Sequence, residues 1–386
     1  MTQTRALLVS DERDLQPHLQ AWSELAALRE RPFCQPEWML AWWRHAAPEG
    51  SQLRTVLVLD GARLIGIAPY FAGRERAGRT DYRLLASGVS HPLDVLAVPG
   101  HEDEVAAAVA RTLAAACPKP TLVTFEGLDE DSAWPAALRS AWPGRLRPRP
   151  YRTSRMTTPL LALPSVDYET WMAGKSSNFR HQMRRLRRKF AAAGGVTYIA
   201  TGQEAIERSA RAFAELHDTR WQERGGSNLR RDETARMLSE AGAALGPDRL
   251  RLWTAELDGD LVAVQVFLAT GSQVAYWNSG WDERHGSFKP AMVGILAAIE
   301  DALARGERRI NFGAGEQPYK LRFAEDTSAG VTWGGMFPVD RRYPATRVQL
   351  APRQLEWWAR RRVRALPPER RARLDRLRDR VQGRLR

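Results

Sequence analysis

The sequence has no apolar run that approaches the roughly 20 residues needed to cross a lipid bilayer. Its first residues, MTQTRALLVS, lack the long apolar core of a secretory signal. Only two cysteines are present, Cys34 and Cys117, so neither a disulfide framework nor a cysteine-based metal site is expected. These absences predict a chain that folds around a hydrophobic core in a reducing, cytoplasmic compartment.

Several short functional motifs are also absent. The chain has no zinc-ligand spacing, Walker loop, Rossmann glycine fingerprint or nucleophile elbow. This argues against the enzyme classes that those motifs define, and no metal is predicted. With 386 residues, 44% of them hydrophobic and 27% charged, the chain is long enough for two globular domains.

The positive charge is concentrated at the end of the chain. The net charge is +13, but residues 351–386 hold 13 arginines against four acidic residues, which leaves about +4 for the rest. The basicity therefore says little about nucleic acid binding by the body of the protein. The tail carries a narrow apolar stripe, formed by Leu374, Leu377, Val381 and Leu385. Such a segment can lie on an anionic membrane surface or remain a solvated extension.

The order of predicted elements occurs twice. Helices are expected at 14–29 and 37–45, a hairpin at 53–60 and 64–71 closed by Asp60-Gly61, strands near 82–86 and 93–98, a helix at 102–116 and a strand at 121–126. Helices at 203–221 and 232–245 follow, then a hairpin at 250–257 and 261–269, a strand at 274–281, a helix at 292–303 and a strand at 309–312. This repetition predicts two similar α/β domains, 1–150 and 151–345, and a basic helical tail, 346–386. The Pro/Arg-rich stretch 143–155 is expected to be a linker or an entering strand.

The segment from Val274 to Phe323 has the richest polar loops. Pro290 suits the first turn of a helix, and Gly306 suits its end. A strand, a crossover helix and a second strand predict a βαβ unit. The start of its helix, near Pro290, is a natural place to hold an anion.

A basic amphipathic helix is expected from Lys175 to Phe190. Ser176 or Ser177 can cap it. Phe179, Met183, Leu186 and Phe190 form its apolar stripe, and arginines occupy the other faces. This pattern is typical both of a solvated surface helix and of an anion-binding helix. On the second interpretation, Arg180 and Arg184 contact phosphate groups.

Four stretches together resemble a known family. RHQMRRLRRKF, LHDTRW, YWNSGWD and GAGEQPYKLRF, in this order, resemble the CelD/BcsL-like acetyltransferases of the GNAT superfamily. The sequence is similar, more distantly, to the FemAB-type peptidyltransferases. The resemblance implies an α/β fold of two tandem GNAT-like domains, each a twisted mixed β-sheet flanked by helices, with an Arg-rich helical tail after them.

The resemblance also implies acetyl-CoA or another acyl-CoA as donor. Its pantetheine arm would enter at a splayed strand end, with the pyrophosphate on the following helix. The residues expected to bind it are Trp277, Asn278, Ser279 and Lys289, together with Arg180 and Arg184. The sequence departs from the family pattern at two places. The loop RHGSFKPA has only Gly286 where relatives have a spaced glycine pair, and Asn311 stands where relatives often carry an acid.

Five residues are candidates for catalysis. Tyr319 would protonate the leaving thiolate, and Lys320 would hold a phosphate or a developing oxyanion. Glu316, Asp282 and His217 are alternative general bases. The competing interpretation is a packed tyrosine, a solvated lysine, surface carboxylates and a structural histidine.

A further pair belongs to the first domain. His91 and Asp94, in SHPLD, either line a cleft between the domains or form a capped turn.

The function expected from these observations is transfer of an acyl group from acyl-CoA to an amine or hydroxyl. The resemblance alone suggests a small-molecule or glycan-precursor acceptor, such as a sugar or polysaccharide precursor. One alternative is a FemAB-like aminoacyltransferase that uses aminoacyl-tRNA, the only case in which a nucleic acid partner is expected. The other is a non-enzymatic module that binds nucleic acid or membrane through its basic segments.

Overall fold

The structure, a computed structural model, describes residues 4–74, 79–222, 225–324 and 328–364. A small sheet contains β1 (Thr4–Val9), β3 (Thr55–Asp60), β4 (Arg63–Ala68) and β7 (Leu96–Ala97), in the order β1-β3-β4-β7. A large sheet has the order β10-β11-β12-β13-β14-β9-β15-β8-β6-β5-β2. Its strands are β2 (Gln52–Leu53), β5 (Tyr70–Arg74), β6 (Thr80–Leu84), β8 (Leu122–Asp129), β9 (Arg149–Ala162), β10 (Val196–Ile199), β11 (Leu250–Leu257), β12 (Asp260–Thr270), β13 (Gln273–Trp281), β14 (Arg309–Asn311) and β15 (Ser328–Phe337).

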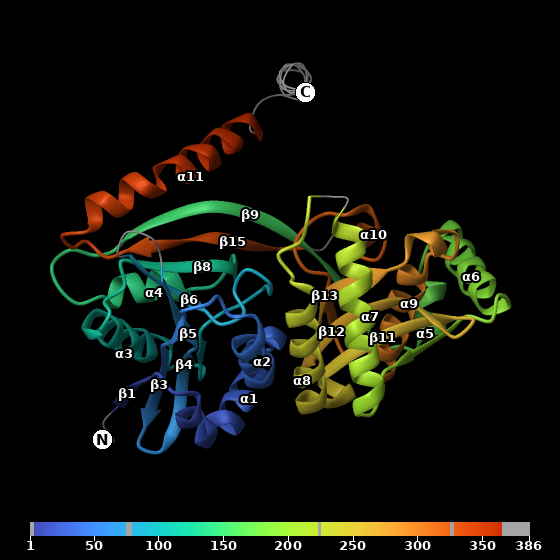
Figure 1. Ribbon diagram of the computed structural model, residues 1–386, viewed down its shortest axis with the longest axis horizontal. Coiled ribbons are helices and arrows are strands. Elements are labelled where there is room, and N and C mark those ends of the chain that lie inside the picture. Colours follow the sequence, from blue (N-terminus) through green and yellow to red (C-terminus); the bar gives the residue numbers. More distant parts are fainter. Residues whose placement is uncertain (1–3, 75–78, 223–224, 325–327, 365–386) are drawn as a thin grey trace.

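Helices flank both parts of the sheet system (Figure 1). In the first half they are η1 (Glu12–His18), α1 (Leu19–Leu28), η2 (Pro32–Cys34), α2 (Pro36–Ala46), α3 (Glu102–Ala115) and α4 (Trp134–Ala141). In the second half they are α5 (Tyr168–Ala173), α6 (Ser177–Ala192), α7 (Gln203–Gln222), α8 (Arg231–Arg249), η4 (Glu283–Phe288), α9 (Pro290–Ala304) and α10 (Pro318–Leu321), and α11 (Tyr343–Arg364) follows β15. The predicted mixed α/β fold with two tandem halves is confirmed.

Two long strands join the halves. The end of β9 pairs with β14, whereas its beginning pairs with β15 from Arg149 opposite Phe337 to Pro159 opposite Ser328. β15 also pairs with β8 of the first half. The stretch 143–155 therefore leads into an entering strand. The expected domain boundary at residue 150 falls inside β9 and stays a prediction.

The first predicted hairpin is confirmed, but its strands are divided between the two sheets. Asp60 pairs with Arg63 around the expected turn, and the same antiparallel pairing continues to Leu53 opposite Phe71. Pro69 separates β4 from β5, because proline has no N–H to donate to a sheet ladder. The chain crosses from the small sheet to the large one at this point, and the Arg54 N–H bonds the Tyr70 carbonyl there at 2.9 Å.

The core continues across the two halves. Trp38 of α2 meets Trp277 of β13 edge to face, with ring centroids 5.1 Å apart.

Helix α7 approaches β13 closely, because Gly280 of β13 has no side chain. A Cβ at that position would lie 2.5 Å from the Phe213 carbonyl oxygen and 2.9 Å from the backbone nitrogen of His217.

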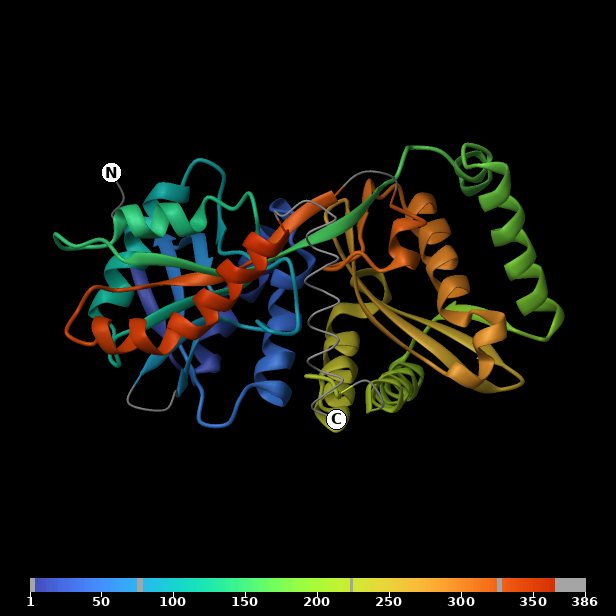
Figure 2. The same cartoon turned by 90° about the horizontal axis from the view of Figure 1, so that it is seen from above.

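The C-terminal helix lies over the large sheet. Figure 1 and Figure 2 show α11 running across β9 and β15. The predicted tail stripe from Leu374 to Leu385 lies outside the described residues. None of the helices in the described part of the chain is both long enough and apolar enough to span a bilayer.

Candidate active site

The two parallel strands of the βαβ unit separate at the candidate site. β13 pairs with β14 only from Gln273 to Ala275, and then continues to Trp281 with β12 as its remaining partner strand. A bulge adds to this divergence: Val266 faces Asn278 and Phe267 faces Tyr276, so Trp277 is the extra residue. The predicted βαβ unit is confirmed, and its strands leave room at the carboxyl end of β13.

A cavity of about 180 Å³ occupies that room. The end of α7, β13, η4, the start of α9 and α10 each contribute to it. Its lining residues are Arg220, Tyr276, Ser279, Trp281, Gly286, Lys289, Ala291, Met292, Ile295 and Tyr319. Three residues predicted from sequence, Ser279, Lys289 and Tyr319, therefore meet around one cavity.

Helix α9 begins at this cavity with an unusual backbone. Lys289 caps it with φ 48° and ψ 54°, a left-handed conformation that glycine adopts at less cost. The N–H groups of Met292 and Val293 both bond the Lys289 carbonyl, at 2.9 and 3.3 Å. The N–H of Ala291 has no hydrogen-bond partner among the described residues. An anion would meet that N–H, the helix dipole and the exposed Lys289 ammonium.

Lys320 is buried, contrary to the alternative of a solvated lysine. It lies with Tyr319 on the single turn of α10, not in an open loop, and only 5% of it is exposed. Its ammonium donates to the carbonyls of Ala314 at 2.9 Å and Gly313 at 3.4 Å. No carboxylate of a described residue forms an ion pair with it, and burial lowers its pKa to about 8. A buried cation held only by carbonyls is costly, which marks Lys320 as a functional candidate.

Tyr319 is a neutral phenol at any physiological pH. Burial, and then the neighbouring Tyr276 hydroxyl, hold its pKa well above the ordinary value. It can therefore donate a hydrogen bond or a proton into the cavity, but it cannot act as a base.

His91 of the first half reaches this region from the opposite side. A Cβ added to Gly313 would lie 3.9 Å from the His91 Nε2. Burial and the Lys320 ammonium lower the His91 pKa to about 4, so the imidazole is neutral. Its ring stands edge-on to Trp333 of β15, with centroids 5.8 Å apart. His91 thus lines the seam between the halves, next to the Gly313 loop.

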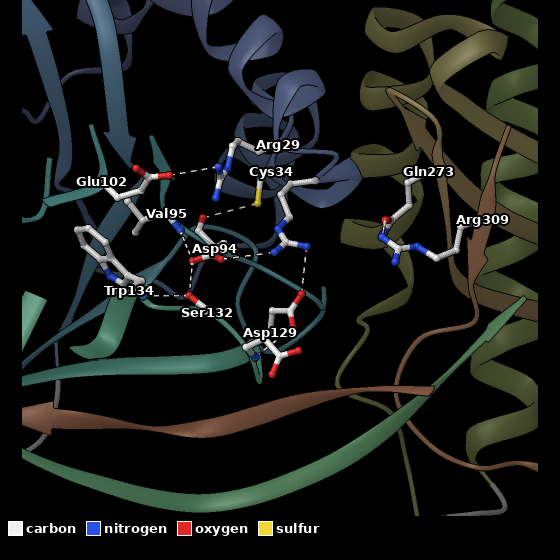
Figure 3. Close-up of polar contacts among 12 residues, drawn as sticks. Arg29, Cys34, Asp94, Val95, Glu102, Asp129, Ser132, Trp134, Gln273 and Arg309 are labelled. Carbon is white, nitrogen blue, oxygen red and sulfur yellow. Dashed lines mark hydrogen bonds and ion pairs between the residues drawn. The ribbon is translucent and has the colours of Figure 1, made fainter. Parts of the chain in front are cut away.

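Asp94 instead holds its own loop in place (Figure 3). Its carboxylate accepts from the Val95 N–H and the Ser132 hydroxyl, both at 2.9 Å. Arg31 bridges Asp94, at 3.7 Å, and Asp129, at 3.1 Å. Burial raises the pKa of Asp94 despite these partners. This geometry agrees with the capped-turn interpretation.

His217 and Trp277 are engaged in packing. His217 is buried, with its Nε2 2.9 Å from the Ser227 hydroxyl and its Nδ1 3.3 Å from the Ser279 carbonyl. Burial lowers its pKa. The Trp277 indole N–H donates to the Val89 carbonyl at 2.7 Å, and its ring stacks on Phe213. Neither residue lines the cavity at Ser279.

The remaining predicted contacts of β13 and the following loop are local. The Asn278 side-chain oxygen accepts from the Ser279 N–H at 2.9 Å. Asp282 caps η4 and forms ion pairs with Arg284 at 2.7 Å and His285 at 3.2 Å. Arg284 lowers the pKa of Asp282. Glu316 is exposed just before α10 and also lies outside the cavity lining.

Helix α6 has the expected cap and stripe. The Ser176 hydroxyl accepts from the Phe179 N–H at 3.2 Å, and Met183, Leu186 and Phe190 are buried.

The two arginines of α6 proposed for donor binding tie this helix to α5. Arg180 donates to the Ala173 carbonyl at 3.0 Å, and Arg184 pairs with the exposed Glu169 at 3.0 Å. Lys189 is the basic residue of α6 that reaches toward the cavity, because its ammonium donates to the Ser287 carbonyl at 2.9 Å.

Some cavity residues were not predicted as site residues. Met292 and Ile295 line the cavity, although their spacing predicts only the apolar stripe of a helix. A helix stripe that covers a sheet and one that lines a pocket have the same period, so no sequence signal separates them. Tyr276 and Trp281 also line the cavity, but β13 is rich in aromatic residues, and the sequence does not show which of them pack in the core and which line a pocket.

Comparison with known proteins finds a matching family for part of the second half. Residues 177–321, from α6 to α10, match the family described as the acetyltransferase (GNAT) domain. This segment contains every residue that lines the cavity at Ser279. No curated protein matches the sequence.

Several solved structures have a similar fold. FemX superposes with a TM-score of 0.61 at 9% identity, over 90% of this chain and 99% of its own. The C-terminal domain of a putative lysylphosphatidylglycerol synthetase from Agrobacterium fabrum gives 0.53 at 9%, over 86% and 96%. A protein of unknown function from Bacteroides thetaiotaomicron gives 0.54 at 13%, over 85% and 99%. At such identities the likeness establishes the fold alone.

Residues 177–321 are therefore similar to the acetyltransferase (GNAT) domain family, and the chain as a whole has a fold similar to that of FemX. The narrower likeness to CelD/BcsL-like enzymes is not confirmed.

Proposed function

We propose that the protein transfers an acyl group from acyl-CoA to an amine or hydroxyl of a sugar or polysaccharide precursor. The observation that carries this proposal is the cavity at the splayed end of β13. It is bounded by the start of α9, by the Tyr319 phenol and by Ser279. A GNAT acetyltransferase domain typically takes acetyl-CoA, and acyl-CoA supplies an activated thioester when bound.

Each residue has a physical role in this proposal. The Lys289 ammonium and the Ala291 N–H bind the negative pyrophosphate of the donor. The buried Lys320 ammonium stabilises negative charge that develops on the thioester carbonyl oxygen, because charges interact more strongly away from water. Tyr319 donates its proton to the departing thiolate, and the proton that the acceptor amine or hydroxyl loses restores the neutral phenol. Among the proposed bases, Glu316 has an exposed carboxylate, whereas Asp282 is ion-paired and His217 is held by two contacts.

The test is calorimetric titration of the protein with acetyl-CoA and longer acyl-CoA thioesters. Lys289→Gly removes the ammonium and keeps a residue that accepts the left-handed backbone, so weaker binding by about tenfold is expected. Lys119→Ala, an exposed lysine of the first half, is the matched control and should bind normally.

An aminoacyl-tRNA is titrated in parallel. The likeness to FemX concerns the fold and does not favour that donor. Salt-sensitive binding of tRNA together with no binding of any acyl-CoA would reject the proposal and support the aminoacyltransferase alternative.

Peripheral contact of the basic tail with the inner face of the membrane belongs to the same proposal. It would bring a cytoplasmic enzyme close to membrane-bound glycan precursors. The support for it is the charge and the apolar stripe of residues 365–386 in the sequence. Deletion of residues 365–386 should remove binding to vesicles that contain phosphatidylserine and leave acyl-CoA binding unchanged. Equal vesicle binding by the full chain and the deletion variant would reject the tail contact.

A further inference from the structure

A second cavity, of about 380 Å³, lies in the first half between the large sheet and α11. It shares no lining residue with the cavity at Ser279. Its volume lies within the range of about 300–1,000 Å³ that is usual for ligand pockets. Residues of β6, β8, β9, β15 and α11 line it, so elements distant in sequence enclose one space.

Helix α11 forms the roof of this cavity. Leu350 is buried against Leu122 and Phe337 of the sheet, which fixes the first half of the helix. Further along α11, Glu356 also lines the cavity. The roof is therefore attached at one end by a small apolar cluster and presents polar side chains beyond it.

The floor is an ordered polar network. The Asp81 side chain is only 1% exposed, and its carboxylate accepts from the Thr124 hydroxyl at 2.7 Å and from the Arg83 guanidinium at 2.7 Å. Arg83 also lies 3.7 Å from Glu126. The Tyr151 hydroxyl is 3.2 Å from that of Thr124. These contacts fix the side chains before any ligand binds, which lowers the entropic cost of binding.

The composition of the lining selects a class of ligand. The carboxylates of Asp81, Glu126 and Glu356 only accept hydrogen bonds, whereas the guanidinium groups of Arg79 and Arg83 only donate them. The three carboxylates disfavour a phosphate, and the two guanidinium groups disfavour a cation. A ligand with many neutral hydroxyl groups can both donate and accept at such a surface.

Trp333 completes the pocket with an aromatic ring. Its ring offers an apolar surface to the C–H face of a sugar, while hydroxyl groups point to the charged residues. We propose that this cavity binds a neutral polyhydroxylated ligand, such as a sugar ring.

Trp333 also connects this cavity to the proposed reaction site. Its ring contacts His91, and His91 lies beside the Gly313 loop that holds Lys320. A sugar bound here would be the part of the acceptor that is recognised but does not react. This last role rests on the proposed function, whereas sugar binding itself does not.

The test is calorimetric titration with neutral sugars, for which N-acetylglucosamine and cellobiose are the probes. Glucose 6-phosphate and glucosamine serve as charged comparisons and should bind at least about tenfold more weakly. Glu126→Gln and Tyr151→Phe each remove a hydrogen-bonding group and keep the shape of the side chain. Both should weaken sugar binding by about tenfold. Glu130→Gln, the same substitution just beyond β8 and outside the cavity lining, should not.

Acyl-CoA binding is measured on the same variants and should be unchanged. Because the two ligands are titrated separately, loss of sugar binding and loss of acyl-CoA binding are distinguishable. The inference is overturned if neither neutral sugar binds, or if the charged sugars bind as well as the neutral ones. Sugar binding that Glu126→Gln and Tyr151→Phe leave intact also overturns it, because the ligand would then occupy another place.

Discussion

The indole N–H of Trp277 donates a hydrogen bond to the carbonyl of Val89, 2.7 Å away and in the other half of the molecule. The bulge in β13 turns Trp277 toward the first half, where it also meets Trp38. A residue that the family resemblance assigns to donor binding therefore contributes to the contact between the halves. Because this contact adjoins the cavity at Ser279, the rigidity of the seam bears on the geometry of the site.

Trp277→Phe should lower the free energy of unfolding by about 1–3 kcal/mol. The aromatic packing is largely kept, but the Val89 carbonyl loses its donor. Urea titration measures the effect. The control is Trp358→Phe on the exposed face of α11, where a change within about 0.5 kcal/mol is expected. Equal effects of the two substitutions would show that the Trp277 hydrogen bond contributes nothing to stability.

Lys320 should give the protein a distinctive dependence of stability on pH. Its pKa is about 8 in the folded chain and close to 10.5 when unfolded, so the unfolded state binds more protons between these values. The free energy of unfolding should therefore rise with pH from about 8 to 10.5, by on the order of 3 kcal/mol. Lys320→Met should abolish this rise, as measured by urea titration at pH 7.5 and 9.5.

The same variant should lose activity, because it removes the buried positive charge near the proposed site. A fall in kcat of at least about 100-fold is expected. Lys119→Met, at an exposed position, is the control for both measurements. A kcat close to that of the unaltered protein in Lys320→Met would remove Lys320 from the mechanism.

Tyr319→Phe separates proton donation from binding. It removes one hydroxyl and keeps the ring that lines the cavity, so kcat should fall by about 100-fold while the affinity for acyl-CoA stays within about twofold. Steady-state kinetics and calorimetry provide the two values. Tyr343→Phe is the matched control, because the Tyr343 ring packs on Phe337 and does not line the cavity at Ser279. A loss of affinity without a loss of kcat would assign Tyr319 to donor binding alone.

Periodicity predicts the elements of the second half well, because local patterns determine them. The hairpin at Asp258-Gly259, the strand at Val274 and the helix after Pro290 are all confirmed. In the first half the division of the strands into two sheets is not predicted, because Pro69 transfers the chain between sheets and only the three-dimensional pairing reveals the second sheet.

The candidate site was also predicted only in part from the sequence. Lys289 and Tyr319 could be named because polar residues in loops after strands stand out in a sequence. The burial of Lys320 and the approach of His91 could not be predicted, because both depend on contacts between distant segments. Likewise, Arg180 resembles a phosphate ligand in sequence, yet its guanidinium bonds the Ala173 carbonyl at the end of α5.

Gly280→Ala should damage both stability and donor binding. The new Cβ would lie 2.5 Å from the Phe213 carbonyl oxygen and 2.9 Å from the His217 nitrogen, and both are backbone atoms that cannot rotate away. Helix α7 would have to move off β13, at a cost of about 1–3 kcal/mol. Since α7 carries Arg220 and β13 carries Ser279, the cavity between them should change shape and acyl-CoA should bind more weakly.

Gly73→Ala is the matched control, because the nearest atom to a Cβ there is 3.9 Å away. Urea titration and calorimetry on the two variants compare a crowded strand glycine with an uncrowded one. If Gly280→Ala were destabilised no more than Gly73→Ala, the close contact of α7 with β13 would be wrong. If it were destabilised but bound acyl-CoA normally, the donor would lie outside the cavity between Arg220 and Ser279.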